Sequence, residues 1–230
     1  MVFNILLFCF SAIFGQRVDI GLVANNEIYD ASWISSSKNN KNLIWTHNDS
    51  GNLGRVYAIG LGGSHLGMLR LQGIIPLDWE DMCIGPGPKK GVDYIYIGDI
   101  GDNFGKKKKK RIYRFEEPIL DIDSSSEPFD IKIKDIEKIT FRYPDAKRDA
   151  ETLVIDPLTG DLYIFTKRES SVYVYSLPFP QSTDTVIVAN HIGNLTISPE
   201  KPFRLSDQVV SGEISRDGSM MLIKTYYHAI

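Results

Sequence analysis

The segment Arg111-Ile-Tyr-Arg-Phe115 decides the fold, because the chain contains two related copies of it, Arg55-Val-Tyr-Ala-Ile59 and Ser171-Val-Tyr-Val-Tyr175. Each copy is a short run of β-branched and aromatic residues around a central tyrosine, which is the composition of a β-strand. The copies recur at intervals of about 60 residues, and a fixed interval of this kind is typical of repeat architectures. The sequence therefore predicts one such strand in each of several similar units.

Two further elements recur upstream of this strand, always in the same order. The nearer one is an apolar run that ends in polar residues, and its copies are Leu43–Ser50, Tyr94–Asn103, Leu162–Glu169 and Met221–Tyr226. The farther one begins with an acidic residue, in Asp30–Ile34, Glu80–Ile84, Glu151–Ile155 and Glu213–Ser215. Turn residues such as Asp156-Pro-Leu-Thr-Gly160 separate the two elements. A weaker fourth strand, such as Ile136–Tyr143, is expected to close each unit.

Units of four short antiparallel strands predict an all-β protein, and among all-β folds they favour a β-propeller. A β-sandwich also has many short strands, but it has no reason to repeat strand, turn and acid in the same order. At the observed interval the chain holds about three and a half blades, whereas closed propellers have about four to eight. We therefore expect the N-terminal part of a longer ring, a truncated product, or a protomer that another chain completes.

The first residues predict secretion. The apolar run Ile5–Phe14 is shorter than the about 20 residues that a membrane-spanning helix needs, and it matches the core of a signal peptide that ends at Gly15. The alternative is a buried N-terminal strand. We assign residues 1–15 to the signal peptide and 16–230 to the propeller domain, and expect an extracellular protein without a membrane anchor. The sequons at Asn48 and Asn194 are then candidate glycosylation sites.

Composition narrows the class of protein. The chain has 230 residues, 43% of them hydrophobic, and a formal charge of −3, which argues against disorder and against a general nucleic-acid binder. Loss of Cys9 with the signal peptide leaves Cys83 alone, so an intrachain disulfide and a cysteine zinc site are excluded. We expect Cys83 to be a buried strand residue. The sequence contains no serine-hydrolase elbow, phosphate-binding loop or dinucleotide fingerprint.

The repeated segments resemble a family of secreted β-propeller proteins found in bacteria and invertebrates. The blade signatures of that family correspond to WTHNDSG and RVYAI within Trp45–Ile59, to YIGDIGDN and IYRF within Asp78–Pro118, and to DAE and LY within Asp149–Tyr163. The resemblance covers most of residues 28–227 and implies a ring of about six or seven blades, but no single activity. The acidic inner strands are more remotely similar to calcium-dependent propeller hydrolases such as phytases and lactonases, which is a likeness of architecture.

The predicted topology brings acidic residues to one rim, because the loop before the first strand and the loop after the second lie on the same face of a blade. Crowded carboxylates raise one another's pKa unless a cation neutralises them, and Ca²⁺ accepts about six to eight oxygen ligands. The candidate calcium ligands are Asp78, Glu80, Asp81, Asp99, Asp102, Asn103, Asp149, Glu151 and Glu213. The same rim is expected to hold Asp30, His47, Asn48, Asp49, Lys167 and Lys224. Ordinary turn chemistry, or pairing with arginines, explains the same acids without an ion.

A basic run formed by Lys106, Lys107, Lys108, Lys109 and Lys110 precedes Arg111. It predicts either a solvated hairpin tip or a contact surface for an extracellular protein or a polyanion.

The function predicted from these features is that of a secreted, non-enzymatic propeller that binds a cation, calcium, on an acidic rim and presents an interaction surface to extracellular partners. An extracellular or mineralised matrix is a natural setting for such a protein. The alternative is a calcium-dependent hydrolase of a phosphate ester or lactone, in which calcium polarises an oxygen of the substrate and His47 transfers a proton.

Overall fold

Four β-sheets make up the described part of the chain, which comprises residues 21–49, 53–122, 127–169, 171–197 and 204–229 of a computed structural model. The predicted signal peptide lies outside the described residues. The single helical element within them is a short 3-10 turn at Leu205–Asp207. No helix there is long and apolar enough to cross a membrane. The all-β class predicted from the sequence is confirmed.

Each sheet is built mainly from strands that follow one another in the chain. The first sheet contains β1 (Ala31–Ser36), β2 (Leu43–Asn48), β3 (Arg55–Gly60), β4 (His65–Leu71) and β8 (Phe129–Ile133). The second contains β5 (Trp79–Pro86), β6 (Asp93–Asp99), β7 (Lys110–Glu116), β9 (Glu137–Arg142) and β13 (Val186–Val188). The third contains β10 (Ala150–Ile155), β11 (Leu162–Thr166), β12 (Val172–Leu177) and β14 (Asn190–Leu195). The fourth contains β15 (Val209–Ile214) and β16 (Met221–Thr225).

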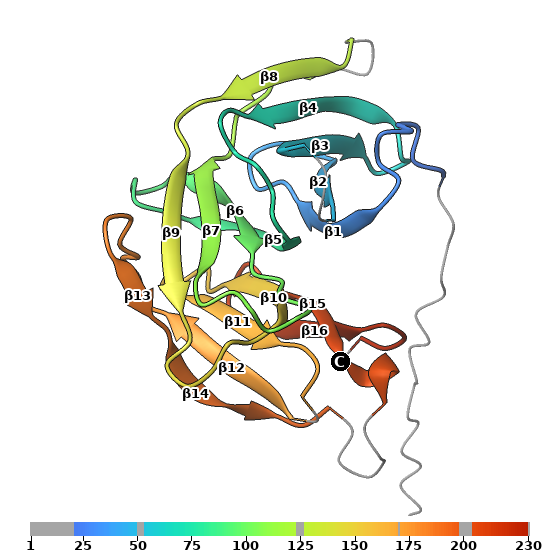
Figure 1. Ribbon diagram of the computed structural model, residues 1–230. Coiled ribbons are helices and arrows are strands. Elements are labelled where there is room, and N and C mark those ends of the chain that lie inside the picture. The colour runs from blue at the N-terminus through green and yellow to red at the C-terminus, as the bar shows by residue number, and fades with distance from the viewer. Residues whose placement is uncertain (1–20, 50–52, 123–126, 170, 198–203, 230) are drawn as a thin grey trace, which may run out of the picture.

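The first strands of the four sheets lie side by side toward the middle of the molecule (Figure 1). Contacts join β1 to β5, β5 to β10, and β10 to β15. The fourth sheet also touches the first, because Lys38 Nζ lies 4.0 Å from Glu213 Oε1 and Arg216 donates a hydrogen bond to the Ser37 carbonyl oxygen at 3.5 Å. Loops at the ends of these inner strands are thereby brought close together.

A β-bulge recurs at the same place in every first strand. The pairing with the second strand shifts between Ala31 and Trp33, Trp79 and Asp81, Ala150 and Thr152, and Val209 and Ser211. A bulge leaves one residue without a partner in the ladder and redirects its side chain. The bulged residues are Ser32, Glu80, Glu151 and Val210. The sequence predicted Glu213 as the counterpart of Glu80 and Glu151 in the fourth unit. That prediction was wrong, because the residue at the equivalent bulge is Val210.

Two strands leave their own unit to extend the preceding sheet. Strand β8, which follows β7 in the chain, pairs in parallel with β4 of the first sheet. Strand β13, which follows β12, pairs in parallel with β9 of the second sheet. The expectation of four antiparallel strands in every unit thus needs correction: the first two sheets have a parallel fifth strand, and the fourth sheet has two strands among the described residues. The weak strand predicted at Ile136–Tyr143 is present as β9.

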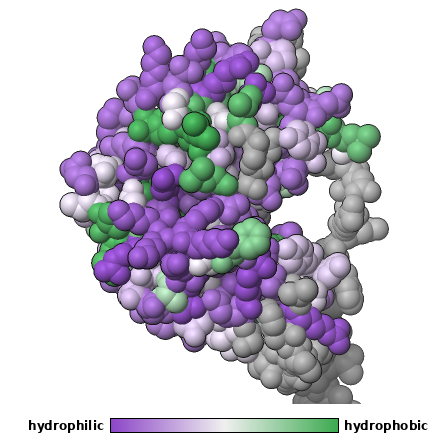
Figure 2. Space-filling view, in the orientation of Figure 1, coloured by the Kyte–Doolittle hydropathy of each residue, from purple (hydrophilic) through white to green (hydrophobic). Residues whose placement is uncertain are grey.

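Three apolar layers between neighbouring sheets form the core. Between the first and second sheets lie Trp45, Val56, Leu69, Met82, Ile95 and Phe115. Between the second and third lie Cys83, Tyr96, Ile112, Phe141, Leu153, Ile164 and Tyr175. A smaller layer of Val154, Phe165, Val209 and Ile223 joins the third sheet to the fourth. Cys83 is a buried free thiol in a strand, as predicted. The face shown in Figure 2 is mostly hydrophilic, with separate hydrophobic areas.

A buried carboxylate links the first two sheets. Glu117 follows β7, and its Oε1 accepts hydrogen bonds from Trp45 Nε1 at 2.7 Å and Ser37 Oγ at 2.5 Å. Its Oε2 accepts the backbone N–H groups of Lys38 and Asn39, each at 3.1 Å. Donors that are buried without an acceptor cost free energy, so this carboxylate stabilises the turn between β1 and β2 as well as the sheet contact.

We predict that Glu117→Ala lowers the free energy of unfolding by roughly 3 kcal/mol, because it leaves several buried donors without an acceptor. Urea denaturation followed by circular dichroism measures this change. The neighbouring Glu116→Ala is the matched control. Glu116 makes an exposed ion pair with Lys89, and loss of such a pair changes stability by about 0.5 kcal/mol or less. Equal effects of the two substitutions would contradict the assignment.

Candidate cation site

Three carboxylates converge where the first and second sheets meet. Oxygen atoms of Asp49, Asp78 and Glu80 lie within 4.8 Å of one another. Asp49 directly follows β2, Asp78 directly precedes β5, and Glu80 is the bulged residue of β5. The bulge is held in place by Ser32 of β1, whose Oγ donates to the Glu80 carbonyl oxygen at 2.5 Å.

Space for these carboxylates depends on Gly101, in the loop that leaves β6. A Cβ atom at this position would lie 2.1 Å from Glu80 Oε1 and 2.7 Å from Asp78 Cγ, both far inside van der Waals contact. The Gly101 N–H donates to the Asp78 carbonyl oxygen at 3.3 Å, which keeps the loop against the cluster. The distinctive GDIGDN segment therefore contributes a glycine that makes room as well as polar side chains.

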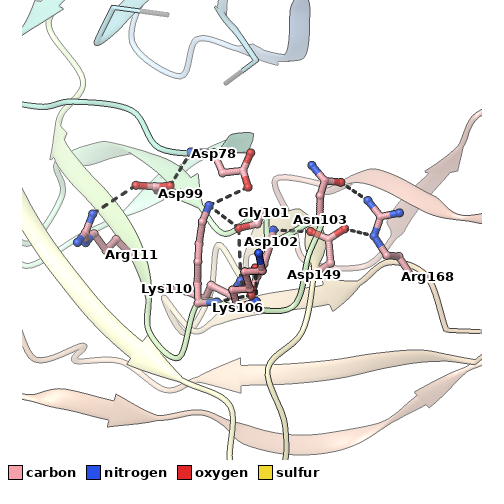
Figure 3. Close-up of polar contacts among 11 residues, drawn as sticks. Asp78, Asp99, Gly101, Asp102, Asn103, Lys106, Lys110, Arg111, Asp149 and Arg168 are labelled. Atoms are coloured by element: carbon pink, nitrogen blue, oxygen red, sulfur yellow. Dashed lines mark hydrogen bonds and ion pairs between the residues drawn. The ribbon is translucent and has the colours of Figure 1, made fainter. Parts of the chain in front are cut away.

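Basic residues of the protein neutralise most of the neighbouring acids (Figure 3). Lys107 Nζ lies 2.8 Å from Asp78 Oδ2. Arg168 Nε lies 2.5 Å from Asp149 Oδ2, and Lys167 makes an ion pair with Glu151. Glu80 differs from these residues, because within the described parts of the chain no hydrogen bond or ion pair holds its carboxylate.

The environment of Glu80 strongly disfavours its charged form. Burial, and to a smaller extent the negative charges of Glu151, Asp49 and Asp78, together raise the pKa of its carboxyl group to about 10. Glu80 is therefore protonated at neutral pH in the absence of a cation. A divalent cation placed among these carboxylates would have to displace that proton, and its charge would then stabilise the carboxylate.

Asp102 organises the next loop and faces away from the cluster. Its oxygens accept the backbone N–H groups of Lys106 and Lys107, each at 2.8 Å, and Lys110 Nζ lies 3.1 Å from Oδ2. Burial raises the pKa of Asp102, but these donors outweigh the effect and the pKa lies below its usual value. Its backbone N–H donates to Asp149 Oδ1 at 2.6 Å, while Asn103 Oδ1 accepts from Arg168 (Figure 3).

The remaining acidic residues also bind donors or cations of the protein itself. Asp81 is completely buried and accepts the N–H groups of Met82 at 2.8 Å and Leu153 at 2.7 Å, which ties β5 to β10. Asp99 Oδ1 accepts the Asp78 N–H at 2.9 Å. Glu213 lies near the far end of β15, at Lys38.

The structure thus divides the nine predicted calcium ligands. Asp78 and Glu80 meet in one cluster, and Glu151 lies close enough for its charge to raise the pKa of Glu80. Lys107 and Lys167 also pair with Asp78 and Glu151. The other six are bound to the protein's own donors or cations and lie outside this cluster: Asp81, Asp99, Asp102, Asn103, Asp149 and Glu213. Asp49 joins the cluster although it was not among the nine. Its position directly after the second strand was the signal that could have identified it.

His47 does not belong to the rim. Its side chain is fully buried and packs edge-on against Trp79, with ring centroids 5.6 Å apart. Burial lowers the pKa of the imidazole to about 4, although a hydrogen bond with the Asn48 carbonyl oxygen opposes this shift. The sequence placed His47 among rim residues because it lies next to Asn48 and Asp49. In a strand, however, adjacent side chains point to opposite faces.

The two sequons have different environments. Asn48 is buried, its Nδ2 donates to the Glu27 carbonyl oxygen at 2.7 Å, and this nitrogen is the atom to which a glycan would be attached. Asn194 lies on β14 with an exposed side chain. The folded protein therefore has room for a glycan at Asn194 and none at Asn48.

The basic run is not a uniformly solvated tip. Lys110 is buried at the start of β7, and Lys107 is half-buried against Asp78, whereas Lys106, Lys108 and Lys109 are exposed. The run therefore supplies internal counter-ions as well as surface charges.

Comparisons with known proteins relate this chain to a propeller structure only distantly. No family model matches the sequence, and no curated protein matches it. Among solved structures, the Dos1 propeller is similar with a TM-score of 0.34 and 11% sequence identity. The match covers 84% of this chain and 52% of that one, so this chain spans about half the length of its structural neighbour.

We predict that the free energy of unfolding of the wild-type protein falls as pH rises between about 6.5 and about 10, because folded Glu80 keeps a proton that the unfolded chain has released. Below about pH 6.5 the lowered pKa of His47 acts in the opposite direction, because the unfolded chain then binds a proton that folded His47 does not. One such proton contributes a slope of up to about 1.4 kcal/mol per pH unit. Glu80→Gln should remove this part of the slope, as measured by urea unfolding at a series of pH values. Glu127→Gln, at an exposed residue, is the control. An unchanged slope in Glu80→Gln would contradict the prediction.

Proposed function

We propose that this protein is a secreted, non-enzymatic member of the β-propeller class that binds Ca²⁺ through Asp49, Asp78 and Glu80. The observation that carries the proposal is the convergence of three carboxylates from different loops, with ligand atoms within 4.8 Å of one another. Carboxylate oxygens are the ligands that Ca²⁺ prefers. Close like charges are unfavourable unless a cation or protons neutralise them.

The position of Lys107 supports the proposal. Its ammonium group lies 2.8 Å from Asp78 Oδ2 and also donates to the Gly101 carbonyl oxygen at 2.9 Å. A cation of the protein itself therefore sits at the edge of the cluster, between oxygen atoms that an ion would also use. Within the described residues no hydrogen bond or ion pair holds the Glu80 carboxylate, which leaves a role there for a second positive charge.

The architecture proposed for this function is a propeller in which the four sheets are consecutive blades and the fourth is incomplete within the described residues. The recurring bulge and the side-by-side first strands support this arrangement. Membership in the secreted propeller family with WTHNDSG, YIGDIGDN and DAE signatures belongs to the same proposal. The hydrolase alternative is weaker, because His47, its proton-transfer group, is buried.

Secretion is proposed from the sequence of residues 1–15. An extracellular or mineralised matrix, where calcium is abundant and partners are anionic, is the proposed setting. The exposed side chain of Asn194 supports the proposal of secretion, because a secreted eukaryotic protein would carry a glycan there.

We predict that CaCl₂ raises the melting temperature at pH 8, because a ligand that binds only the folded state stabilises it, by about 2.7 kcal/mol at 100 times the Kd. Asp78→Asn and Glu80→Gln should each abolish the shift, and binding should be stronger at pH 9 than at pH 6 because Glu80 must lose its proton. Asp121→Asn, at an exposed acid, is the control. The same shift with NaCl at equal ionic strength, or its persistence in Asp78→Asn, would refute the calcium site.

We also predict a single occupied sequon when the full chain is expressed in a eukaryotic secretory host. Asn194 should carry a glycan and Asn48 should not, because the Asn48 amide is buried and hydrogen-bonded. Enzymatic deglycosylation followed by intact-mass measurement shows this, and Asn194→Gln should remove the mass shift. Retention of the protein inside the cell, or a glycan on Asn48 in folded protein, would contradict the prediction.

A further inference from the structure

The loop between β6 and β7, residues 100–109, holds positive charges that the cation site does not use. The side chains of Lys106, Lys108 and Lys109 are exposed, and none of them has an ion-pair partner within the described residues. Lys107 and Lys110 are bound by Asp78 and Asp102. Within the described part of the chain, the loop therefore presents three ammonium groups that form no ion pair.

Hydrogen bonds within the loop tie its backbone and its side chains together. The Gly105 N–H donates to the Asp102 carbonyl oxygen at 2.8 Å, which closes a turn. The Asp102 carboxylate accepts the next two backbone N–H groups, those of Lys106 and Lys107. The Gly101 carbonyl oxygen accepts from Lys107 Nζ at 2.9 Å and from Lys110 Nζ at 3.3 Å. A ligand that binds a preorganised loop loses less affinity to the ordering of the chain.

An exposed aromatic ring lies beside the lysines. Phe104 is 83% exposed, and Lys106 Nζ lies 5.3 Å from the centre of its ring. Among the described contacts the ring meets only the Lys106 ammonium group, so most of its surface is open to a ligand. Phenyl rings offer an apolar face on which the C–H side of a sugar ring can pack, while ammonium groups bind sulfate or carboxylate groups.

We propose that Lys106, Lys108, Lys109 and Phe104 form a docking surface for a sulfated polysaccharide. The charge complementarity is local, because the protein as a whole has a formal charge of −3 and the acidic cluster adjoins the loop through the contact between Lys107 and Asp78. The negative charges of this cluster would repel a wide polyanion such as a nucleic-acid duplex more strongly than a single polysaccharide chain.

This surface is separate from the calcium site, so its test does not depend on calcium. Isothermal titration calorimetry with a heparin oligosaccharide, in EDTA at low salt, should detect binding to the wild-type chain. Lys108→Ser/Lys109→Ser should weaken it at least tenfold and reduce the slope of log Kd against log salt by about two, one for each charge removed. Phe104→Ala should weaken binding with the salt slope unchanged, because no charge is lost.

Lys134→Ser/Lys138→Ser is the matched control, since it removes two exposed lysines, one from the loop before β9 and one from β9, and should leave the affinity within twofold. The proposal is overturned if the wild-type chain does not bind heparin, if the loop and control variants lose affinity equally, or if RNA or anionic vesicles bind more tightly than heparin. Circular dichroism of each variant verifies the fold. Heparin binding in EDTA, together with a melting temperature that CaCl₂ does not raise, would support this surface and contradict the calcium site.

Discussion

The side-by-side packing of the four first strands is the constraint on which the rest of the structure depends. It brings the loops of different sheets to one place, and each first strand carries a bulge near its start. Bulges redirect a side chain that regular pairing would place elsewhere. In β5 and β10 the redirected residues are Glu80 and Glu151, so acidic groups that are distant in the chain become electrostatic neighbours.

An uncompensated buried charge is costly, so a carboxylate at these junctions either accepts hydrogen bonds or keeps a proton. Asp81 and Glu117 accept backbone N–H groups from neighbouring sheets and act as cross-links between them. Asp102 accepts N–H groups and an ammonium group, and orders a loop. Glu80 has no comparable donor among the described residues and keeps a proton instead. This contrast separates the acids that hold the fold together from the cluster proposed to bind calcium.

The basic loop after β6 combines two roles that its composition does not distinguish. Lysines of one short run supply ammonium groups both to internal acids and to the surface. The inward lysines compensate Asp78 and Asp102, and in doing so they fix the backbone that carries the outward ones. The cation site and the proposed polysaccharide surface therefore share a scaffold, although each can be tested without the other.

Local patterns in the sequence determined the all-β class, the order of the repeated strands, the apolar character of Cys83 and the recurring acids. Alternating apolar residues and turn residues act over a few positions, so they can be recognised without tertiary information. Only the tertiary structure decided which acids meet, why Val210 and not Glu213 matches Glu80, that His47 is buried, and which lysines point inward. These outcomes depend on bulge positions and on contacts between sheets, where residues far apart in the chain compete for the same donors and the same space.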